Sequence, residues 1–245
     1  MVDSYEDLEF AALYDPQNPW GPSDDFYLGY VLGAASALDV GCGTGGLLCR
    51  AREYGHTGEL VGVDPATGML AVALAKRDDI EYVQATAQEM DLGRRFELVT
   101  MTGHAFQELL DDAATRAALA RFRAHLVPGG LLVFETRNPL ARAWERWTPE
   151  HMSGTVRAPD GTEYAVELDV LGQPAPDLVE MSGTYTNRVT GAVGVDTGSL
   201  RFVAADRLRE LLAEAGFRVE DWYGSWDRGP VTGSSPEIIV VAAAP

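Results

Sequence analysis

The sequence has little positive charge and few cysteines. Its 245 residues carry 19 Lys and Arg against 37 Asp and Glu, which gives a net charge of −18. A surface this acidic repels a phosphate backbone, so nucleic acid is set aside as a substrate. The two cysteines, Cys42 and Cys49, are seven residues apart, which is neither a metal-ligand spacing nor a disulfide framework for a chain of this size.

Long apolar segments are also missing. The longest apolar runs, LLVF at 131–134 and IIVVAAA at 238–244, are far too short to cross a bilayer. The opening stretch MVDSYEDLEF is acidic and lacks an apolar core, so it does not fit a signal peptide. The sequence therefore predicts a soluble cytoplasmic protein without membrane contact, and it leaves the oligomeric state open.

The chain does contain a repeated strand-then-helix pattern. Strands are expected at 36–40, 59–64, 80–84, 96–101 and 131–136, and helices up to about Tyr54, from Pro65 to about Lys76 and over 112–126. Five such units predict an α/β fold, a doubly wound and mostly parallel sheet with helices on both faces. An amphipathic helix at 204–217 and a strand at 237–244 complete it, and that strand is apolar on both faces and so should be buried.

Two regions depart from this pattern. Residues 5–14 fit a helix that DPQNPWGP ends, and Ser23 is a plausible N-cap for a helix over 24–34. After Arg137, a short helix at 138–147 precedes strand-like runs with a hairpin signal at Asp160-Gly161. The predicted organisation is an N-terminal helical lid segment (1–35), a ligand-binding α/β domain (36–137 and 204–245) and an inserted antiparallel region that covers the substrate (138–203).

The glycine loop ALDVGCGTGG, residues 37–46, contains the G-x-G-x-x-G spacing usually assigned to a dinucleotide. Asp39 precedes it at the end of a strand, where a carboxylate would repel a pyrophosphate. S-adenosylmethionine has a sulfonium, an ammonium and no phosphate, so it suits this position better. Asp64, at the end of the next strand, can accept both ribose hydroxyls of either ligand and does not discriminate between them.

Four motifs, in order and spacing, resemble those of the class I S-adenosylmethionine-dependent methyltransferases of the small-molecule type. They are LDVGCGTG at 38–45, VGVDPATGML at 61–70, LVPGGLLVFE at 126–135 and AGF at 215–217. Together they cover most of the chain. The resemblance implies a seven-stranded sheet whose last strand is antiparallel. It also implies S-adenosyl-L-methionine as the methyl donor, lying over Gly41 to Gly45, and S-adenosyl-L-homocysteine as the product.

The resemblance also supplies a set of donor-binding residues. They are Tyr14, Asp39, Gly41, Cys42, Gly43, Gly45, Asp64, Pro65, Met69, Thr86, Ala87, Gln88 and Thr102. One position departs from the family pattern, because Thr86 follows the third strand where many members have an Asp that reads the adenine amino group. Gln88, Glu89 or a backbone group would then take that role.

The loop MTGHAFQ, residues 101–107, follows the fourth strand and is expected beside the glycine loop. It lacks the Asp or Asn followed by Pro-Pro of members that methylate adenine or glutamine nitrogen, and the Asp of Mg²⁺-dependent members, so no metal is expected. His104 is its only titratable side chain and the candidate general base for a hydroxyl, carboxylic acid or phenol acceptor. Alternatively, His104 bonds a backbone carbonyl or packs in the site wall.

Other side chains near this edge are candidates for contact with a small-molecule acceptor. They are Trp20, Phe26, Phe106, Gln107, Arg137, Trp144, Trp147 and Trp226. Arg137 would pair with a carboxylate of the substrate or with a surface acid such as Glu135. Trp144 and Trp147 share a helical face, from which they either pin the insert to the core or line the acceptor site.

The sequence thus predicts a methyltransferase that acts on an oxygen or nitrogen of a small molecule. An NAD-dependent oxidoreductase is the alternative enzyme, although Asp39 and the VPGG turn argue against it. Two further readings stay open: a catalytically silent S-adenosylmethionine-binding protein, and a family member that uses the donor for other chemistry.

Overall fold

The computed structural model describes residues 5–245, and residues 1–4 of the predicted N-terminal segment lie outside the described residues. The larger of its two sheets contains β1 (Ser36–Val40), β2 (Glu59–Asp64), β3 (Glu81–Gln84), β4 (Phe96–Met101), β5 (Leu126–Arg137), β10 (Arg218–Tyr223) and β11 (Glu237–Ala243). Their order is β10-β11-β5-β4-β1-β2-β3. Strands β1 to β5 pair in parallel, whereas β11 is antiparallel to both β5 and β10. The predicted seven-stranded, mostly parallel sheet is confirmed.

The antiparallel direction of β11 has a local consequence. Its first residue, Glu237, lies opposite Arg137, the last residue of β5. The carboxyl edge of the parallel strands, where ligands bind in such sheets, therefore also receives the side chain that begins β11.

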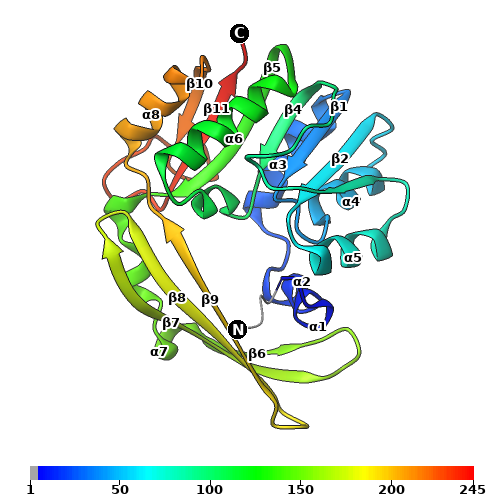
Figure 1. Ribbon diagram of the computed structural model, residues 1–245, viewed down its shortest axis with the longest axis vertical. Helices are drawn as coiled ribbons and strands as arrows, with labels where there is room; N and C mark the ends of the chain where they lie inside the picture. The colour runs from blue at the N-terminus through cyan, green and yellow to red at the C-terminus, as the bar shows by residue number, and fades with distance from the viewer. Residues whose placement is uncertain (1–4) are drawn as a thin grey trace.

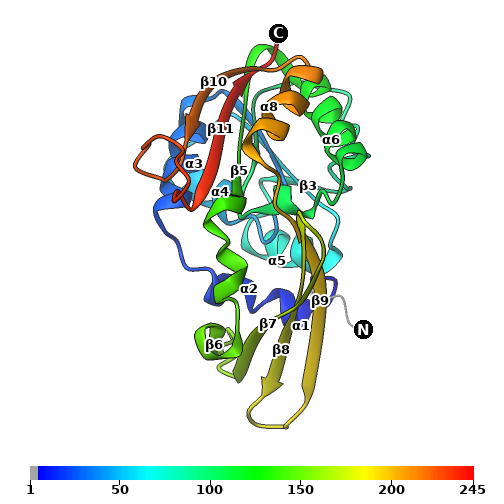
Figure 2. The same ribbon diagram turned by 90° about the vertical axis from the view of Figure 1, so that its left-hand side faces the viewer.

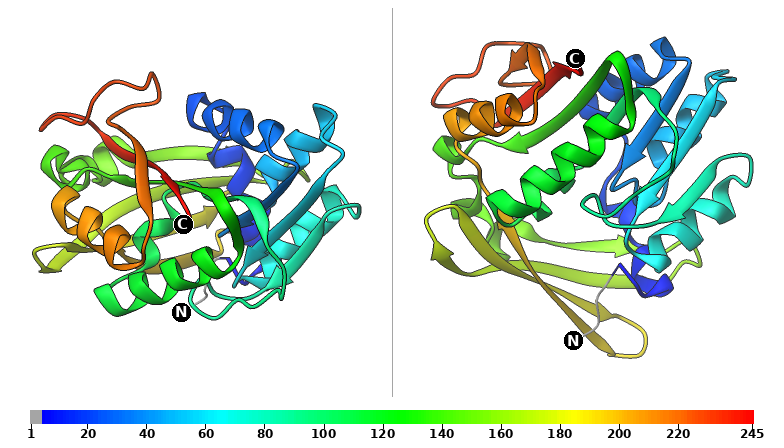
Figure 3. Two further views of the ribbon diagram at one scale, coloured as in Figure 1. Left: turned by 90° about the horizontal axis from the view of Figure 1, so that it is seen from above. Right: turned by 45° about the horizontal axis from the view of Figure 1, so that its top comes forward.

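Helices cover both faces of this sheet (Figure 3). They are α3 (Pro22–Gly33), α4 (Gly46–Glu53), α5 (Thr67–Lys76), α6 (Asp112–Ala124) and α8 (Ala205–Glu214). Helices α3 and α4 bury Val31 and Leu48 in one apolar layer, and α6 and α8 bury Phe122 and Leu211 in another. Burying a Leu or Phe side chain stabilises a fold by about 1.5–3 kcal/mol. None of the helices within residues 5–245 combines the length and the apolar character that crossing a bilayer requires.

The second sheet is the predicted antiparallel insert. It contains β6 (Ser153–Arg157), β7 (Glu163–Ala175), β8 (Leu178–Asn187) and β9 (Val193–Arg201), paired in sequence order. Figure 1 shows it beneath the larger sheet. The β6–β7 hairpin turns at Asp160-Gly161, as predicted, and Gly161 has a φ of 91°, which favours glycine.

The N-terminal segment lies between the insert and the larger domain (Figure 2). Its short helices are α1 (Leu8–Ala11) and α2 (Tyr14–Gln17). Leu13, between them, is fully buried against Val156, Tyr164 and Val166 of the insert. The apolar face of the insert is therefore completed by the N-terminal segment.

Several predicted boundaries near the N-terminus are wrong. The helix expected over 5–14 is interrupted, and α2 continues through Pro16, because a proline in the first turn loses no helical hydrogen bond. Ser23 is not the N-cap of α3. Pro22 takes the first helical position after Gly21, and the Asp24 carboxylate accepts a hydrogen bond from the Gly21 N–H at 2.8 Å.

Three later boundaries also differ. Pro65 precedes α5 rather than opening it, since the helix begins at Thr67. Helix α6 ends at Ala124 because Leu126 already pairs with Phe96, so β5 begins five residues before the predicted start. The short helix expected at 138–147 is two 3₁₀ turns, η2 (Pro139–Ala141) and η3 (Ala143–Arg146).

We predict that residues 155–203, expressed alone, are unfolded. Val156, Tyr164 and Val166 would lose Leu13 and Phe10, the partners that cover them. A four-stranded sheet without a covered apolar face is marginal in water. Circular dichroism during heating checks this, and a soluble fragment with a cooperative melting transition would contradict it.

Candidate active site

The glycine loop joins β1 to α4 at the carboxyl edge of the sheet. The backbone N–H groups of Gly41 and Cys42 donate to the Val63 carbonyl at 2.7 and 3.0 Å, which ties the loop to β2. Gly41, Gly43 and Gly45 have φ values of 69°, 53° and 71°, in the region that favours glycine. A Cβ on Gly43 would meet nothing within 4 Å. At Gly43 the loop backbone is therefore open to close approach, whereas Gly41 is covered by Ala105 and Gly45 by Tyr82.

Asp64 lies beside this loop at the end of β2 and is 7% exposed. Its Oδ2 accepts from the Gly43 N–H at 2.8 Å, and its Oδ1 accepts from the Ala66 N–H at 2.9 Å. Burial raises the pKa of Asp64, and these two backbone hydrogen bonds oppose the shift. Each carboxylate oxygen keeps a second lone pair. The residues present thus fit an adenosyl ligand whose ribose hydroxyls bind Asp64.

Asp39 lies beneath the loop within β1 and is only 1% exposed. The Thr100 hydroxyl donates to its Oδ1 at 2.7 Å. Burial raises the pKa of Asp39 to about 7, and the nearby charges of Asp64 and Glu135 add to the rise while the Thr100 hydrogen bond opposes it. With so little surface, Asp39 is not exposed for direct contact with a ligand.

The N-terminal segment is anchored to the glycine loop. Asp15 of α2 forms an ion pair with Lys76 of α5 at 2.5 Å and accepts a hydrogen bond from the Thr44 hydroxyl at 2.5 Å. Lys76 also donates to the Thr44 carbonyl at 2.9 Å. Three separate elements are therefore tied together over the loop.

Tyr14 connects the two sides of the crevice. Its hydroxyl lies 3.2 Å from the position that a Cβ on Gly103 would take, so it reaches the loop after β4. Burial raises the pKa of Tyr14 to about 12, with Glu135 and Asp64 adding to the rise. Tyr14 therefore lies within electrostatic range of both the Asp64 side and the Glu135 side.

The remaining predicted donor residues make mainly local contacts. Met69 and Ala87 are buried. Thr86 donates from its hydroxyl to Glu89 at 2.9 Å, so the two side chains at the predicted adenine position bind each other. The carbonyls of Pro65, Gln88 and Thr102 accept hydrogen bonds from Gln84, Arg121 and Ala105.

His104 is surrounded by groups that the sequence did not place there. Its backbone N–H donates to Glu135 Oε1 at 2.7 Å, and its Nε2 lies 3.0 Å from Glu237 Oε2. The Tyr27 hydroxyl donates to the other Glu135 oxygen. The loop itself contains no carboxylate, as expected, but two carboxylates reach His104 from β5 and β11, and the expectation of Glu135 as a surface acid is wrong. Glu135 is 1% exposed, because the ends of β5 and β11 converge on the loop after β4.

Electrostatics at Glu135 reflect this burial. Burial raises the pKa of Glu135, while the electrostatic interaction with His104 and the hydrogen bonds from Tyr27 and the His104 backbone lower it. Burial also raises the pKa of the Tyr27 phenol, and the Glu135 charge adds to that rise. Tyr27 therefore stays a neutral hydrogen-bond donor to the carboxylate.

Phe106 and Gln107 belong to the wall of the site and are not open to an acceptor. Phe106 stacks on Phe134 with ring centroids 4.2 Å apart. Gln107 has no exposed surface; its Oε1 accepts from Arg137 at 2.7 Å and its Nε2 donates to the Arg201 carbonyl at 3.0 Å. This corrects their prediction as substrate contacts, because the turn after β4 folds inward.

Two other predicted aromatic residues pack at the insert. The rings of Trp144 and Trp147 lie 4.5 and 5.9 Å from the ring of Phe202, between β9 and α8. The Arg137 guanidinium lies 4.9 Å from the centre of the Trp147 ring. Trp144 therefore contacts the junction with the insert, and Trp147 also borders Arg137.

Trp20, Phe26 and Trp226 lie on the α3 side of the sheet. Trp20 donates to Asp25 at 2.7 Å, and the Arg50 guanidinium lies 4.6 Å from its ring centre. Phe26 and Trp226 pack edge to face, 5.6 Å apart. The prediction of these three as acceptor contacts is not supported, because their rings pack against α3, α4 and the C-terminal loop.

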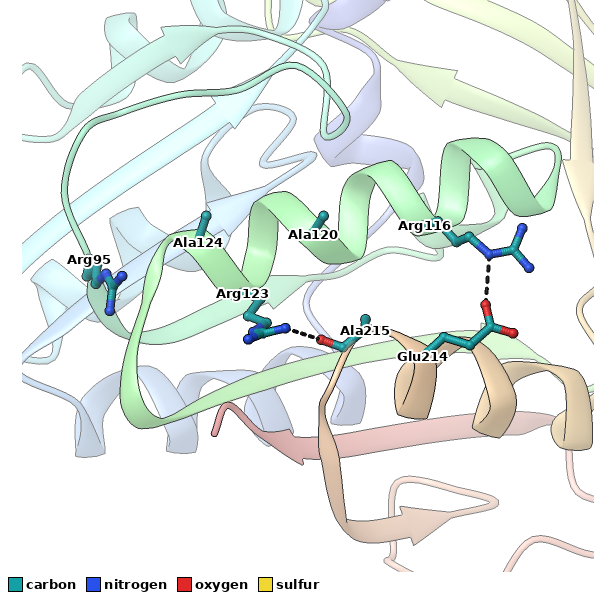
Figure 4. A pocket seen from close by; sticks show the side chains of 7 residues that line it. All are labelled: Arg95, Arg116, Ala120, Arg123, Ala124, Glu214 and Ala215. Atoms are coloured by element: carbon teal, nitrogen blue, oxygen red, sulfur yellow. Dashed lines mark hydrogen bonds and ion pairs between the residues drawn. The ribbon is translucent and has the colours of Figure 1, made fainter.

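A surface pocket of about 410 Å³ lies elsewhere, between α6 and α8 (Figure 4). It is lined by Arg95, Arg116, Ala120, Arg123, Ala124, Glu214 and Ala215. Arg116 pairs with Glu214 at 2.8 Å, and Arg123 donates to the Ala215 carbonyl at 3.1 Å. These contacts join the ends of two helices at the amino edge of β4 and β5, opposite the His104 edge. Across residues 5–245, no group of three or more His, Cys, Asp or Glu side chains could hold a metal ion.

Comparison with known proteins bears on this arrangement. A family model described as a methyltransferase domain matches residues 37–130. A dTDP-3-amino-3,6-dideoxy-alpha-D-glucopyranose N,N-dimethyltransferase of Streptomyces fradiae is 36% identical over 129 residues, 51% of this chain and 47% of that protein. An S-adenosylmethionine-bound amino pentose methyltransferase from Micromonospora echinaspora superposes with a TM-score of 0.68 at 25% identity, over 95% of this chain and 94% of that chain.

Residues 37–130 thus resemble a methyltransferase domain, and the fold is that of S-adenosylmethionine-dependent methyltransferases of known structure. The chain spans about half the length of the curated relative from Streptomyces that it matches. A glycine/sarcosine N-methyltransferase of Parasynechococcus marenigrum is 27% identical over 202 residues, 80% of this chain and 67% of that protein. The solved structure from Micromonospora echinaspora contains S-adenosylmethionine, which favours that ligand over a dinucleotide for this fold.

We predict that Asp64→Ala weakens S-adenosylhomocysteine binding by at least about tenfold, because two charge-assisted hydrogen bonds of about 1.5–3 kcal/mol each are lost. Calorimetry measures the dissociation constant. Asp79→Ala, which removes an exposed carboxylate that pairs with Arg77, is the matched control. An unchanged dissociation constant for Asp64→Ala would place Asp64 outside the donor site.

Asp39→Asn should change how stability depends on pH. Because the folded-state pKa is about 7, the unfolded chain releases this proton at lower pH than the folded chain does. The wild type should therefore lose stability as pH rises from about 4 to about 7, by up to about 1.4 kcal/mol per pKa unit. Asn removes this loss and keeps an acceptor for Thr100. Urea unfolding near pH 5 and near pH 8 should show the variant gaining relative to wild type at the higher pH; an identical difference at both would refute the shift.

Proposed function

We propose that this chain transfers a methyl group from S-adenosylmethionine to a nitrogen or oxygen of a small-molecule acceptor. The observation that carries this proposal is the meeting of two groups at one edge of the sheet. The open backbone at Gly43 and the Asp64 carboxylate form one group. His104 with Glu135 and Glu237 forms the other, with Tyr14 in range of both.

S-adenosylmethionine supplies a methyl group bound to a positively charged sulfur. The protein's contribution is alignment and the exclusion of water. Asp64 and the glycine loop hold the nucleoside end, and Tyr14 with the anchored N-terminal segment covers it. The three acids Asp39, Asp64 and Glu135 favour a cation in the crevice.

His104 is the candidate to take a proton from the acceptor. Its Nε2 side is held by Glu237, whereas its Nδ1 makes no hydrogen bond with any described residue. The triad pattern, in which a carboxylate orients an imidazole, matches this arrangement. A hydroxyl, phenol or acid acceptor needs such a base, and a neutral amine needs mainly positioning.

The relatives support a nitrogen acceptor without excluding oxygen. Two of them are named as N-methyltransferases, of an amino sugar nucleotide and of glycine or sarcosine. Another is named as a ubiquinone biosynthesis O-methyltransferase. For the chain as a whole, we propose a small-molecule acceptor, a cytoplasmic location and the division into residues 1–35, 36–137 with 204–245, and 138–203.

The direct test is release of S-adenosylhomocysteine from S-adenosylmethionine in the presence of paired small amines and alcohols. Acceptor-dependent release, with the methylated product identified by mass spectrometry, is the expected result. Tight donor binding with no product from any acceptor class would favour the catalytically silent alternative.

We predict that His104→Ala separates the acceptor classes. With a hydroxyl or acid acceptor, turnover should fall by about a hundredfold or more, the range for loss of a general base. With an amine acceptor, the loss should be smaller, because only positioning suffers. Glu237→Gln keeps a hydrogen-bonding group beside Nε2 but removes its charge, and it should give an intermediate loss with a hydroxyl acceptor.

Turnover of each variant is compared with wild type across pH on the true acceptor. Full activity of His104→Ala, with an unaltered pH profile, would assign the histidine to the wall of the site.

A further inference from the structure

Arg137 is a partly buried cation without an anionic partner. It ends β5 at the carboxyl edge of the sheet. Among residues 5–245, no carboxylate oxygen lies within 4.0 Å of its guanidinium; its hydrogen bond to the Gln107 side-chain oxygen, at 2.7 Å, is with a neutral group. Burial lowers the pKa of Arg137, so the protein surroundings work against its charge. Buried charges in proteins are normally paired.

The carboxylates nearest to Arg137 are already engaged. Glu237, opposite it in the strand pairing, binds His104 through Oε2 at 3.0 Å. Glu135 accepts hydrogen bonds from the His104 backbone and from Tyr27. Glu237 and Glu135 stabilise the guanidinium charge from a distance, but neither forms an ion pair with it.

A second buried arginine in the same protein shows the contrast. Arg201 is 7% exposed and pairs with Asp112 at 2.7 Å and with Asp177 at 2.9 Å. Where this chain buries an arginine to join elements, it supplies two carboxylates. Arg137 has none, although it lies at the edge where a substrate would bind.

The Arg137 guanidinium has donors that no described residue uses. An arginine carries five N–H donors, and Arg137 uses only Nη1 with a described residue. Three side-chain polar atoms within residues 5–245 are fully buried and have no hydrogen-bond partner: Arg94 Nε, Thr136 Oγ1 and Trp222 Nε1. The other nitrogens of Arg137 are not among them. Nε and Nη2 therefore keep some solvent-accessible surface and are free to donate to a ligand.

The guanidinium is also held in a fixed orientation. Gln107 is fully buried, and its Nε2 donates to the Arg201 carbonyl at 3.0 Å, so its oxygen must point to Arg137. The Trp147 ring lies 4.9 Å from the guanidinium carbon and is packed on Phe202. A fixed planar fork is the arrangement that binds a carboxylate through two hydrogen bonds.

We propose that Arg137 binds a carboxylate group of the methyl acceptor, so that the acceptor is an amino- or hydroxy-carboxylic acid. This inference rests on the proposed function, because it identifies the acceptor class of the same site. The carboxylate completes the ion pair that Arg137 lacks. It also places the rest of the molecule beside His104. Glu237 contacts His104 and lies opposite Arg137 in the strand pairing of β5 with β11.

Benzoate and benzamide, which differ in charge but hardly in shape, are probes that require no methyl transfer. Ligand-observed NMR titrations of the full chain, with and without S-adenosylhomocysteine, measure their dissociation constants. Wild type should bind benzoate at least about tenfold more tightly than benzamide, the minimum expected from one charge-assisted pair. Arg137→Gln should abolish that preference, and Arg137→Lys, which keeps the charge without the fork, should reduce it.

Arg157→Gln is the matched control, because it removes the same charge from an exposed ion pair on β6. It should leave benzoate binding unchanged. The proposal is overturned if benzoate does not bind at up to about 50 mM, or if benzamide binds as well. It also fails if Arg137→Gln and Arg157→Gln have equal effects, or if a folded Arg137→Gln or Arg137→Lys variant keeps the full preference.

These outcomes are separable from failure of the proposed function. If S-adenosylhomocysteine does not bind, the methyltransferase proposal fails, whereas the benzoate preference of the donor-free chain still reports on Arg137. If S-adenosylhomocysteine binds but the benzoate preference is absent, only the carboxylate subsite is refuted.

Discussion

The buried carboxylate of Glu135 organises the acceptor side of this protein. Glu135 lies two residues before the end of β5. Its carboxylate accepts a hydrogen bond from the His104 N–H in the loop after β4 and another from the Tyr27 hydroxyl of α3. Hydrogen bonds to a charged group contribute about 1.5–3 kcal/mol each, and leaving such a group without them is costlier still. One side chain therefore connects three elements that are distant in the sequence.

Three buried acids lie at this edge of the sheet. Asp39, Asp64 and Glu135 all have pKa values raised by burial, and the charges of Asp64 and Glu135 contribute to the rise at Asp39. A phosphate would add to this repulsion, whereas a permanent positive charge relieves it. Under the proposed function, the glycine loop would allow close approach to the backbone, and the acids would favour a cationic donor over a dinucleotide.

Much of the fold could be predicted because it depends on local pattern. The apolar strands SALDV, ELVGVD and FELVTM have the predicted bounds, since burial on both faces leaves a continuous apolar run. The candidate donor residues could be placed from the sequence for a similar reason, because the glycine loop follows β1 directly and Asp64 is the last residue of β2. The predicted helix starts were less accurate. Helix α3 begins at Pro22 with Asp24 binding the Gly21 N–H, whereas Ser23 was predicted as its N-cap.

The surroundings of His104 depend on contacts between residues that are far apart in the sequence, and the sequence indicated fewer of these contacts. Glu237 and the contact of Tyr27 with Glu135 were missed because nothing in the local sequence marks them. Glu237 could have been found, since an antiparallel last strand must begin where the parallel strands end. Tyr27 reaches Glu135 from a helix 108 residues earlier, and no periodicity predicts that contact. Phe106 and Gln107 were placed in the right loop, but its inward turn was not evident.

The edge of the sheet that carries the glycine loop and Asp64 should bind an adenosyl ligand with a positive or neutral tail and should reject one with a pyrophosphate. Calorimetric titration of the full chain with S-adenosylhomocysteine and with NADH, under the same buffer conditions, tests this most directly. The account predicts saturable binding of S-adenosylhomocysteine and no measurable binding of NADH. Saturable binding of NADH, with none of S-adenosylhomocysteine, would contradict it.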